Sequence, residues 1–340
     1  MNLLTPFGKL YGRLMDVRNR LYDRGAFRSY DLGARTISVG NLTTGGTGKT
    51  PLAALIAKLL IDDGETVCIL TRGYGRVHPR SRVLVSDGKN VLADAAMGGD
   101  EPVELAMKLE GKAIIVADPD RVAAAKWARE NFSLTTFILD DGFQHRRARR
   151  DLDIVCIDAT NPCGNGRVIP AGTLRESFRN LRRADAIVIT RTELVEETNS
   201  LQARLRNKNQ KAPIFLATTQ IVGFIPLEEF HGERVEIRSS IGSAFVFTAI
   251  GSSEGFIRTL ARSGVDIRGN QTFRDHHHFT QRDIDGVERR ACDHGPAALV
   301  TTAKDAVKLR GLKFGFPVYV AIAETIIEDP EAFRNLVISS

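Results

Sequence analysis

Short runs of apolar residues, many of them β-branched, recur along the first part of the chain. They cover residues 36–40, 67–70, 113–117, 137–139, 154–157 and 186–189. Segments with helical spacing, such as residues 51–61 and 122–129, lie between them. Buried strands that alternate with helices are typical of a mostly parallel sheet with helices on both faces. The pattern therefore predicts an α/β fold.

Beyond residue 213 the pattern changes. After residues 213–217, residues 220–225 and 234–238 suggest a short β link, and a second set of apolar runs follows at residues 245–250, 299–301 and 317–321. Two segments with helical spacing, residues 252–262 and 281–293, separate these runs. We therefore expect a core domain at residues 31–218 and a smaller α/β domain at residues 219–340. The smaller domain should close a cleft between the two.

The first 30 residues form a separate amphipathic segment. Apolar residues follow one another at spacings of four, three, four, three and four: Leu3, Phe7, Leu10, Leu14, Val17 and Leu21. This spacing places them on one stripe of a helix. The other faces carry six basic and two acidic residues, a local net charge of +4. Two interpretations remain open: a helix in an anionic lipid interface, or a helix packed on its own domain with a solvated basic face.

Composition narrows the class of protein. The chain has 340 residues, 43% hydrophobic and 26% charged, and this favours a folded protein with a large core over a disordered or collagenous one. No apolar run approaches the roughly 20 residues of a membrane-spanning helix. The net charge of +6 allows anionic partners. Nucleic acid is not an expected partner, because the basic residues 145–150 have no aromatic platform beside them.

A glycine-rich loop separates the strand at residues 36–40 from the helix at residues 51–61. Its glycines let backbone N–H groups turn toward a polyphosphate, and the helix that follows adds its positive end. Lys49 would reach the β- and γ-phosphates, and Thr50 would offer its hydroxyl to Mg²⁺. The expected nucleotide-binding residues are Thr44, Gly45, Gly46, Thr47, Gly48, Lys49 and Thr50. The strict P-loop motif has Gly where this chain has Thr43.

A second phosphate-site element follows the apolar run at residues 135–139, which ends in Asp140 and Asp141. An acid at the carboxyl end of a buried strand faces the phosphate crevice of such folds. We expect Asp140 to hold Mg²⁺ directly or through water, and Asp141 to orient neighbouring groups. Which of the two contacts the metal first stays open at this point.

The segment Asp140-Asp141-Gly142-Phe143-Gln144-His145-Arg146, beside the altered loop, resembles one known family, the tetraacyldisaccharide 4′-kinases. Further blocks of the resemblance cover most of the chain in order: residues 40–43, 71–75, 99–102, 170–172, 174–176, 275–277 and 304–308. The chain departs from the family pattern at Thr173, where Pro is common, and at Ala303, where an acid is common.

The resemblance implies an activity that the residues alone do not specify. It implies transfer of the ATP γ-phosphate, with Mg²⁺, to the 4′-hydroxyl of a tetraacylated glucosamine disaccharide 1-phosphate in lipid A biosynthesis. It also implies a peripheral enzyme at the cytoplasmic face of a bacterial inner membrane, which favours contact of the helix at residues 1–30 with the anionic membrane surface. We expect a monomer. The alternative is a P-loop ATPase switch of the partitioning type, although those proteins carry an additional Lys where this chain has Thr44.

The expected catalytic residues are Asp100, His276, Lys49 and Asp141. A kinase needs an acceptor for the hydroxyl proton near the metal, and Asp100, which opens a helix, is the first candidate. The resemblance favours this role over a simple helix N-cap. His276 could share the proton or hold Asp100 in position if the second domain closes, while surface histidines and a metal site are the alternatives for residues 276–278.

Substrate contact is expected from residues in the remaining family blocks. Arg72, Arg175 and Glu176 follow predicted strands or open a helix, where side chains from different loops converge on phosphate. The resemblance adds Asn41 and Gln144 to the substrate-binding set.

Overall fold

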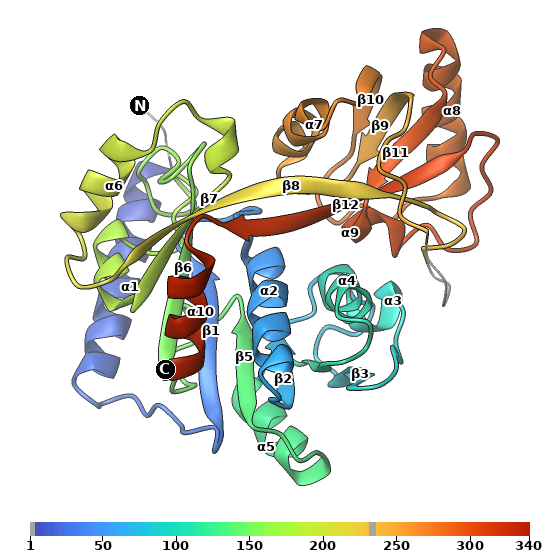
Figure 1. Ribbon diagram of the computed structural model, residues 1–340. Helices are drawn as coiled ribbons and strands as arrows, with labels where there is room; N and C mark the ends of the chain where they lie inside the picture. Colours follow the sequence, from blue (N-terminus) through green and yellow to red (C-terminus); the bar gives the residue numbers. More distant parts are fainter. Residues whose placement is uncertain (1–3, 231–235) are drawn as a thin grey trace.

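The computed structural model describes residues 4–230 and 236–340, so Leu3 of the apolar stripe lies outside the described residues. The strands form one twelve-stranded sheet in the order β10-β9-β11-β12-β8-β7-β6-β1-β5-β2-β4-β3. Figure 1 shows two lobes joined by the long strands β8 and β12. The first lobe holds the nucleotide-loop region, and the second holds the segment around His276.

The sheet of the first lobe is parallel except at one edge. Its strands, from the ribbon outward, are β7 (Ala186–Thr190), β6 (Leu152–Asp158), β1 (Arg35–Asn41), β5 (Thr136–Asp140), β2 (Val67–Thr71), β4 (Ile114–Ala117) and β3 (Val83–Asp87). β3 pairs antiparallel with β4 at the outer edge. The mostly parallel sheet predicted from the apolar runs is therefore confirmed.

Helices cover both faces of this sheet. They are α1 (Thr5–Asp23), α2 (Lys49–Asp62), α3 (Ala95–Gly98), α4 (Asp100–Lys108), α5 (Arg121–Asn131) and α6 (Asn199–Arg206), with 3₁₀ turns η1 (Phe178–Arg183) and η2 (Thr192–Leu194). Successive strand residues point to opposite faces. Ile138 therefore packs in the core beneath α2 and α4, whereas Phe137 and Leu139 pack in the core beneath α5.

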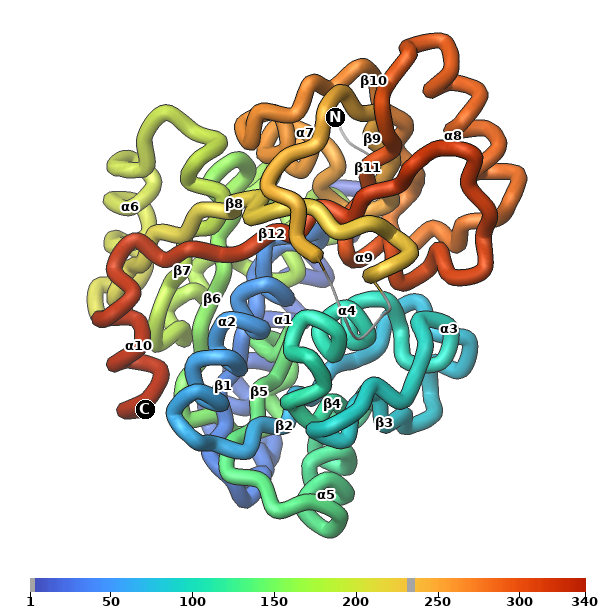
Figure 2. The backbone as a smooth tube through the Cα atoms, turned by 45° about the vertical axis from the view of Figure 1, so that its right-hand side comes forward, coloured from blue at the N-terminus to red at the C-terminus, as the bar shows by residue number. Residues whose placement is uncertain are grey.

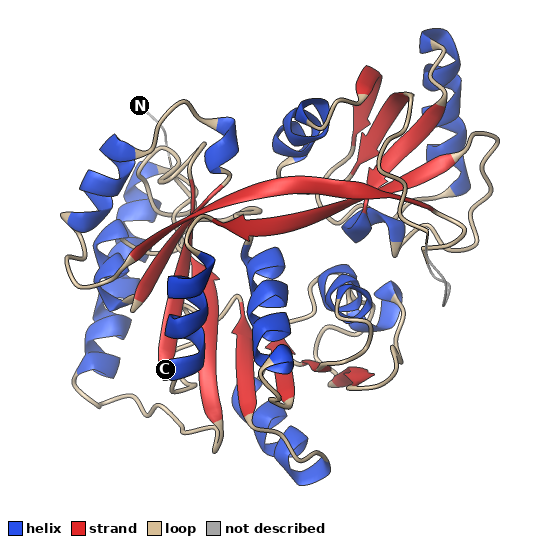
Figure 3. Cartoon of the chain, in the orientation of Figure 1, coloured by secondary structure: helices blue, strands red, loops and turns tan. Residues whose placement is uncertain are grey.

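Two long strands connect the lobes. β8 (Ile214–Pro226) begins beside β7 in the first lobe and then pairs antiparallel with β12 (Val318–Ile327) along most of its length. The β8–β12 ribbon spans the space between the lobes, as the strand colouring of Figure 3 makes plain. The two lobes therefore share a continuous hydrogen-bonded sheet.

The second lobe is a smaller parallel sheet with helices. Its strands are β9 (Ser243–Thr248), β10 (Asp266–Thr272) and β11 (Ala298–Thr302), and its helices are α7 (Ser253–Arg262), α8 (Gln281–His294) and α9 (Ala303–Ala306). α8 begins with a complete capping box, in which Thr280 and Asp283 satisfy each other's backbone N–H groups. Phe245 and Phe247 fill the core between the sheet and α8.

The structure divides the chain differently from the predicted limits of residues 31–218 and 219–340. Residue 218 lies inside β8, so no linker separates the two parts there. The final helix, α10 (Pro330–Ser339), returns to the first lobe, where Phe333 packs edge-on against Phe215 with ring centroids 5.2 Å apart. Figures 1 and 2 show α10 beside α2. The end of the chain therefore completes the core of the first lobe.

Helix α1 leaves its apolar stripe in solvent. It is seated through small residues: a Cβ on Gly8 would lie 2.7 Å from the Val168 carbonyl oxygen, and Asn19 is buried. On the other side, Phe7 is 63% exposed and Leu14 is 59% exposed, with Leu10 and Val17 also exposed. Burial of apolar surface therefore does not account for this stripe within the described chain. None of the described helices has the length and hydropathy of a membrane span.

Candidate active site

The glycine-rich loop lies where the sequence predicted it, between β1 and α2. Gly48 caps α2 with φ +78°, a left-handed conformation that disfavours other residues. A Cβ there would also lie 3.3 Å from Thr190 Cγ2. The residues from Thr44 to Gly46 are exposed, whereas Thr47 is buried. The loop therefore presents its glycine backbone to solvent above a fixed base.

Neighbouring segments hold this base in place. The Thr44 N–H donates to the Thr173 carbonyl oxygen at 2.7 Å, and the Thr190 hydroxyl donates to the Thr47 carbonyl oxygen at 2.9 Å. Inside the loop, Asn41 Nδ2 donates to Thr47 Oγ1 at 2.9 Å. The loop is thus preorganised before any phosphate arrives, which reduces the cost of ordering it on binding.

Asp141 is bound to cationic side chains of the first lobe. Both of its carboxylate oxygens lie 2.7 Å from Arg175 Nη1, and Oδ1 lies 3.5 Å from Lys49 Nζ. Burial raises the pKa of Asp141, but Lys49 and Arg175 outweigh it and the net shift is downward. Asp141 also has a positive φ of 55°, which directs its carboxylate back toward the loop. It is therefore an ionised anchor for Lys49.

Asp140 lies in the opposite electrostatic situation. Its side chain is buried, and its Oδ1 has no hydrogen-bond partner among the described residues. Burial, together with the nearby charges of Glu101 and Asp141, raises its pKa to about 7, although Lys49 and Arg121 act against this shift. A buried carboxylate oxygen without a partner is costly unless a cation compensates it.

These features fit a magnesium ion held partly by the protein and partly by nucleotide phosphates. Mg²⁺ commonly binds through one or two carboxylates plus substrate phosphates rather than in an all-protein cage. In agreement, residues 4–230 and 236–340 contain no group of three or more His, Cys, Asp or Glu side chains arranged around a metal. Asp140 has an oxygen to offer, while Asp141 is already engaged by Lys49 and Arg175.

Asp100 and His276 meet across the two lobes. His276 Nδ1 lies 2.9 Å and 3.0 Å from the two carboxylate oxygens of Asp100. Asp100 opens α4 directly after Gly99, whose φ is +94° and whose added Cβ would lie 2.7 Å from the Tyr74 carbonyl oxygen. His276 has a positive φ of 61°. The pair is thus held by unusual backbone geometry on both sides.

The charges of this pair stabilise each other. The hydrogen bond to Asp100 raises the pKa of His276 despite its partial burial. Burial raises the pKa of Asp100, but the hydrogen bond from His276 and the charge of Lys304 outweigh it, so the net shift is downward. Both shifts favour an imidazolium beside a carboxylate.

Two lysines of the second lobe complete this cluster, and the sequence interpretation gave them no role. Lys304 Nζ lies 2.9 Å from Glu101 and 3.2 Å from Asp275. Lys308 is buried, 3.9 Å from Asp100 Oδ2 and 2.9 Å from Asp305 Oδ1. Their spacing of four residues, inside a block already noted at residues 304–308, was the available signal.

Asp305 anchors the backbone that carries His276. Its Oδ2 accepts hydrogen bonds from the Thr248 hydroxyl at 2.7 Å and from the Ala249 N–H at 3.0 Å. The Ala249 carbonyl oxygen in turn accepts from the His276 N–H at 3.2 Å. The loop after Ala249 also meets the phosphate loop, because a Cβ on Gly251 would lie 3.1 Å from the Gly46 nitrogen. The two parts of the site are therefore neighbours.

Two of the expected substrate contacts, Asn41 and Glu176, are buried. Asn41 is 0% exposed and Glu176 is 0% exposed. Glu176 accepts hydrogen bonds from Asn19 at 2.7 Å, Gln144 at 3.0 Å and Arg183 at 2.8 Å. Glu176 thus holds α1 and the Gln144 segment, while Asn41 donates to Thr47 inside the loop and its own buried Oδ1 has no partner among the described residues.

The remaining predicted residues differ in how they join the site. Gln144 donates to the Asn41 carbonyl oxygen at 2.8 Å and so links the loop to Glu176. Arg72 stacks over Tyr74 and donates to its hydroxyl at 2.9 Å. Its guanidinium is therefore bound to Tyr74 and not to Asp140 or Asp141. The sequence interpretation overlooked Arg121, a buried cation whose charge acts on Asp140. It comes from the start of α5 and carries no motif.

The fold and the site together define a class: a P-loop phosphotransferase, with a nucleotide loop, two acids behind it and a carboxylate–histidine pair between the lobes. Comparisons with known proteins agree. The family model for Tetraacyldisaccharide-1-P 4′-kinase matches residues 1–340, and the chain belongs to this family.

Individual relatives show how far the similarity extends. The chain is 37% identical over 350 residues to the tetraacyldisaccharide 4′-kinase of Syntrophus aciditrophicus, covering 99% of this chain and 92% of the relative. It is 37% identical over 326 residues to that of Desulfotalea psychrophila, covering 95% and 92%. The crystal structure described as the "apo" form of LpxK from Aquifex aeolicus in complex with ATP matches with a TM-score of 0.75 at 30% identity, covering 99% of this chain and 98% of that chain.

Proposed function

We propose that this chain transfers the γ-phosphate of ATP to the 4′-hydroxyl of a tetraacylated glucosamine disaccharide 1-phosphate, a step of lipid A biosynthesis. The observation that carries this proposal is the contact between Asp100 and His276 across the cleft, beside the preorganised phosphate loop. A pure ATPase switch does not require a proton acceptor for an alcohol.

Each part of the site receives a role. The backbone N–H groups from Thr44 to Gly48 and the Lys49 ammonium bind the ATP phosphates, and Thr50 lies at the start of α2. We assign Asp140, Thr50 and Asp141 as the residues that would hold the metal. Mg²⁺ would supply neutralisation of the developing phosphate charge. Arg72, Arg175 and Gln144 remain our candidates for contact with nucleotide or sugar phosphate.

The transfer step follows from these roles. Asp100 orients the 4′-hydroxyl and accepts its proton as the hydroxyl oxygen bonds to the γ-phosphorus and the bond to the β–γ bridging oxygen breaks. His276, held as the imidazolium, positions the Asp100 carboxylate. Lys49 compensates the charge that develops on the departing phosphate.

The test is transfer of labelled γ-phosphate from Mg-ATP to a tetraacyl disaccharide 1-phosphate in detergent micelles. A labelled bisphosphorylated lipid is expected from the unaltered protein and not from Lys49→Ala. ATP hydrolysis without labelled lipid would instead favour the partitioning-type ATPase. The sedimentation velocity of the same preparation tests our proposal that the chain works as a monomer.

We further propose that α1 lies in the interface of the bacterial inner membrane, at its cytoplasmic face. The exposed residues Phe7, Leu10 and Leu14 supply an apolar face, and the exposed side chains of Lys9 and Arg13 supply charge for anionic headgroups. This position would bring the active site to the depth of the sugar headgroup.

Vesicle sedimentation tests this position. Leu10→Ser with Leu14→Ser should reduce binding to neutral and anionic vesicles alike, because apolar burial is lost. Lys9→Glu with Arg13→Glu should reduce binding to anionic vesicles alone. Arg18 is unsuitable for this test because its Nη2 donates to the Gln144 carbonyl oxygen at 2.9 Å. Unchanged binding in both variants would exclude the interfacial position.

A further inference from the structure

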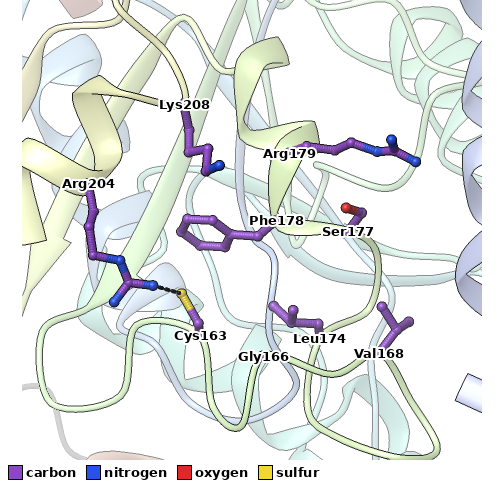
Figure 4. A pocket seen from close by; sticks show the side chains of 9 residues that line it. All are labelled: Cys163, Gly166, Val168, Leu174, Ser177, Phe178, Arg179, Arg204 and Lys208. Carbon is purple, nitrogen blue, oxygen red and sulfur yellow. Dashed lines mark hydrogen bonds between the residues drawn. The ribbon is translucent and has the colours of Figure 1, made fainter. Parts of the chain in front are cut away.

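A cavity lies behind the segment that carries Arg175. It has a volume of about 320 Å³ and lies between residues 163–179 and α6 (Figure 4). Val168, Leu174 and Phe178 supply apolar lining, and Ser177 supplies a hydroxyl. The cavity therefore offers an apolar wall and polar groups together, as the headgroup region of an amphiphile requires.

All the charged side chains that line this cavity are cationic. They are Arg179, Arg204 and Lys208, and no carboxylate lines the cavity with them. Arg179 is ion-paired with Asp16 of α1. Arg204 donates only a weak hydrogen bond to Cys163 Sγ at 3.4 Å, and the described part of the chain gives Lys208 no ion pair. Two exposed cations thus stand beside one cavity without a compensating anion.

The cavity is distinct from the phosphotransfer site, although one segment serves both. Arg175 turns its guanidinium toward Asp141, whereas Leu174 and Ser177, on either side of Arg175, line the cavity. The Arg175 N–H donates to the Leu42 carbonyl oxygen at 2.8 Å, which ties this segment to the end of β1. A ligand in the cavity would therefore lie behind the active-site wall and not in the path of ATP.

The cavity lies next to the helix that we place in the membrane interface. Val168 lines it and also supports α1, since a Cβ on Gly12 would lie 3.6 Å from Val168 Cγ2. The Arg179–Asp16 ion pair joins the cavity rim to α1 from the other side. Any lipid that surrounds α1 is therefore close to the cationic side chains.

We propose that this cavity binds the phosphate of an anionic membrane phospholipid, with Arg204 and Lys208 as phosphate ligands and Val168 and Phe178 against the glycerol and first acyl carbons. The proposal rests on the interfacial position of α1. A guanidinium and an ammonium on one rim suit a phosphodiester, which is singly charged and needs few donors. The site would give the enzyme a second, lipid-selective contact with the bilayer.

The first test compares binding to phosphatidylcholine vesicles with and without phosphatidylglycerol. Arg204→Glu with Lys208→Glu should weaken binding to the phosphatidylglycerol vesicles by about 25-fold or more, because each basic residue near an anionic surface contributes roughly a fivefold factor. Binding to pure phosphatidylcholine should not change. Arg206→Glu is the matched control, since Arg206 lies on α6 but does not line the cavity.

If Arg204→Glu with Lys208→Glu loses, on a logarithmic scale, no more than twice what Arg206→Glu loses, the attraction is a diffuse surface effect and the proposal is overturned. A different result would show that only the proposed interfacial position of α1 is wrong: the Leu10→Ser, Leu14→Ser protein would then bind both vesicle types as the unaltered protein does. Turnover of substrate in detergent micelles should be the same in all these variants. An increased KM for the disaccharide in the cavity variant would assign the cavity to substrate and also overturn the proposal.

Cys163 gives a local readout of occupancy. It lines the cavity and is partly buried, whereas Cys68 and Cys156 are fully buried. In a Cys292→Ser background, alkylation of Cys163 followed by mass spectrometry should slow with phosphatidylglycerol vesicles and not with inorganic phosphate. Burial raises the pKa of the Cys163 thiol, so the reaction is run at alkaline pH. Unchanged alkylation with bound vesicles, or equal protection by inorganic phosphate, would contradict a lipid-phosphate site.

Discussion

The phosphate loop and the Asp100–His276 pair are built in contrasting ways. The loop and its flanking helix occupy one continuous stretch, from Asn41 to Asp62, and side chains of adjoining strands hold the loop. The pair joins residues 176 positions apart, from different lobes, and depends on Lys308 and Asp305 of the second lobe. Because the phosphate loop lies within one lobe, small movements of the lobes leave its geometry unchanged. The Asp100–His276 contact, in contrast, exists only when the lobes meet.

Their electrostatics differ in the same sense. Asp140, behind the loop, has a pKa raised to about 7, chiefly by burial, and lacks a partner for one oxygen. Asp100 has a lowered pKa because His276 and Lys304 outweigh its burial. The loop side therefore leaves Asp140 with an uncompensated carboxylate that a cation from solution can stabilise, while the pair carries its own compensation. Four experiments test this difference between the loop and the pair.

The largest effect is expected from Lys49→Ala. Loss of a preorganised cation at the transferred phosphate should lower kcat by about 10³-fold, the upper range for removing one electrostatic stabiliser. Steady-state transfer assays with varied Mg-ATP measure it. Lys58→Ala, an exposed change on the same helix, is the control and should leave kcat unchanged. Near-normal turnover in Lys49→Ala would remove the loop from the mechanism.

Asp100→Asn should lower kcat by about 10²- to 10³-fold, with a small change in the KM for ATP, because a positioned proton acceptor is lost. The variant also reports on the pair itself. Since Asp100 raises the pKa of His276, its removal should lower the His276 titration midpoint followed by NMR. An unchanged midpoint would show that the two side chains do not meet in solution.

Magnesium binding should weaken as the pH falls below about 7. Asp140 must lose its proton to bind a cation, and its raised pKa of about 7 places that loss near neutrality. Calorimetric titration of Mg-ATP should show up to about a tenfold loss of affinity per pH unit below that value. Asp140→Asn is the control for protons on ATP itself. The same pH slope in that variant would assign the effect to the nucleotide.

The smallest effect is expected from Lys308→Met. Lys308 is one of the charges that lower the pKa of Asp100, so its loss should move the acid midpoint of the kcat profile to higher pH. Turnover at alkaline pH should fall by only a few-fold. Lys308→Arg should restore the midpoint, and the exposed Lys313→Met should not move it. A uniform loss of kcat at every pH would leave Lys308 a structural role alone.

Local patterns predicted most of the first lobe and the loop. Apolar runs located its buried parallel strands, because strands covered on both faces are continuously apolar. β10 (Asp266–Thr272) was missed because its residues alternate between exposed and half-buried and include five polar side chains and a Gly. The length of β8 was also missed, since its central residues are partly exposed in the ribbon.

Site relations that cross the lobes were harder to predict. The positions of Lys304 and Lys308 relative to Asp100 follow from packing of α9 against α4, which no local pattern encodes. In the same way, nothing in the sequence showed that Glu176 would be buried among Asn19, Gln144 and Arg183. Long-range contacts decide which polar residues touch substrate and which only hold the scaffold.

The β8–β12 ribbon has a mechanical consequence. Two antiparallel strands joined by backbone hydrogen bonds resist independent rotation of the lobes far more than a single flexible linker. We therefore expect the lobes to move relative to each other by bending and twisting of the β8–β12 ribbon. Because α10 packs on the first lobe, it fixes the end of the β8–β12 ribbon that lies there. We therefore expect that moving the lobes apart bends this ribbon, and that the unbent ribbon favours the contact between His276 and Asp100.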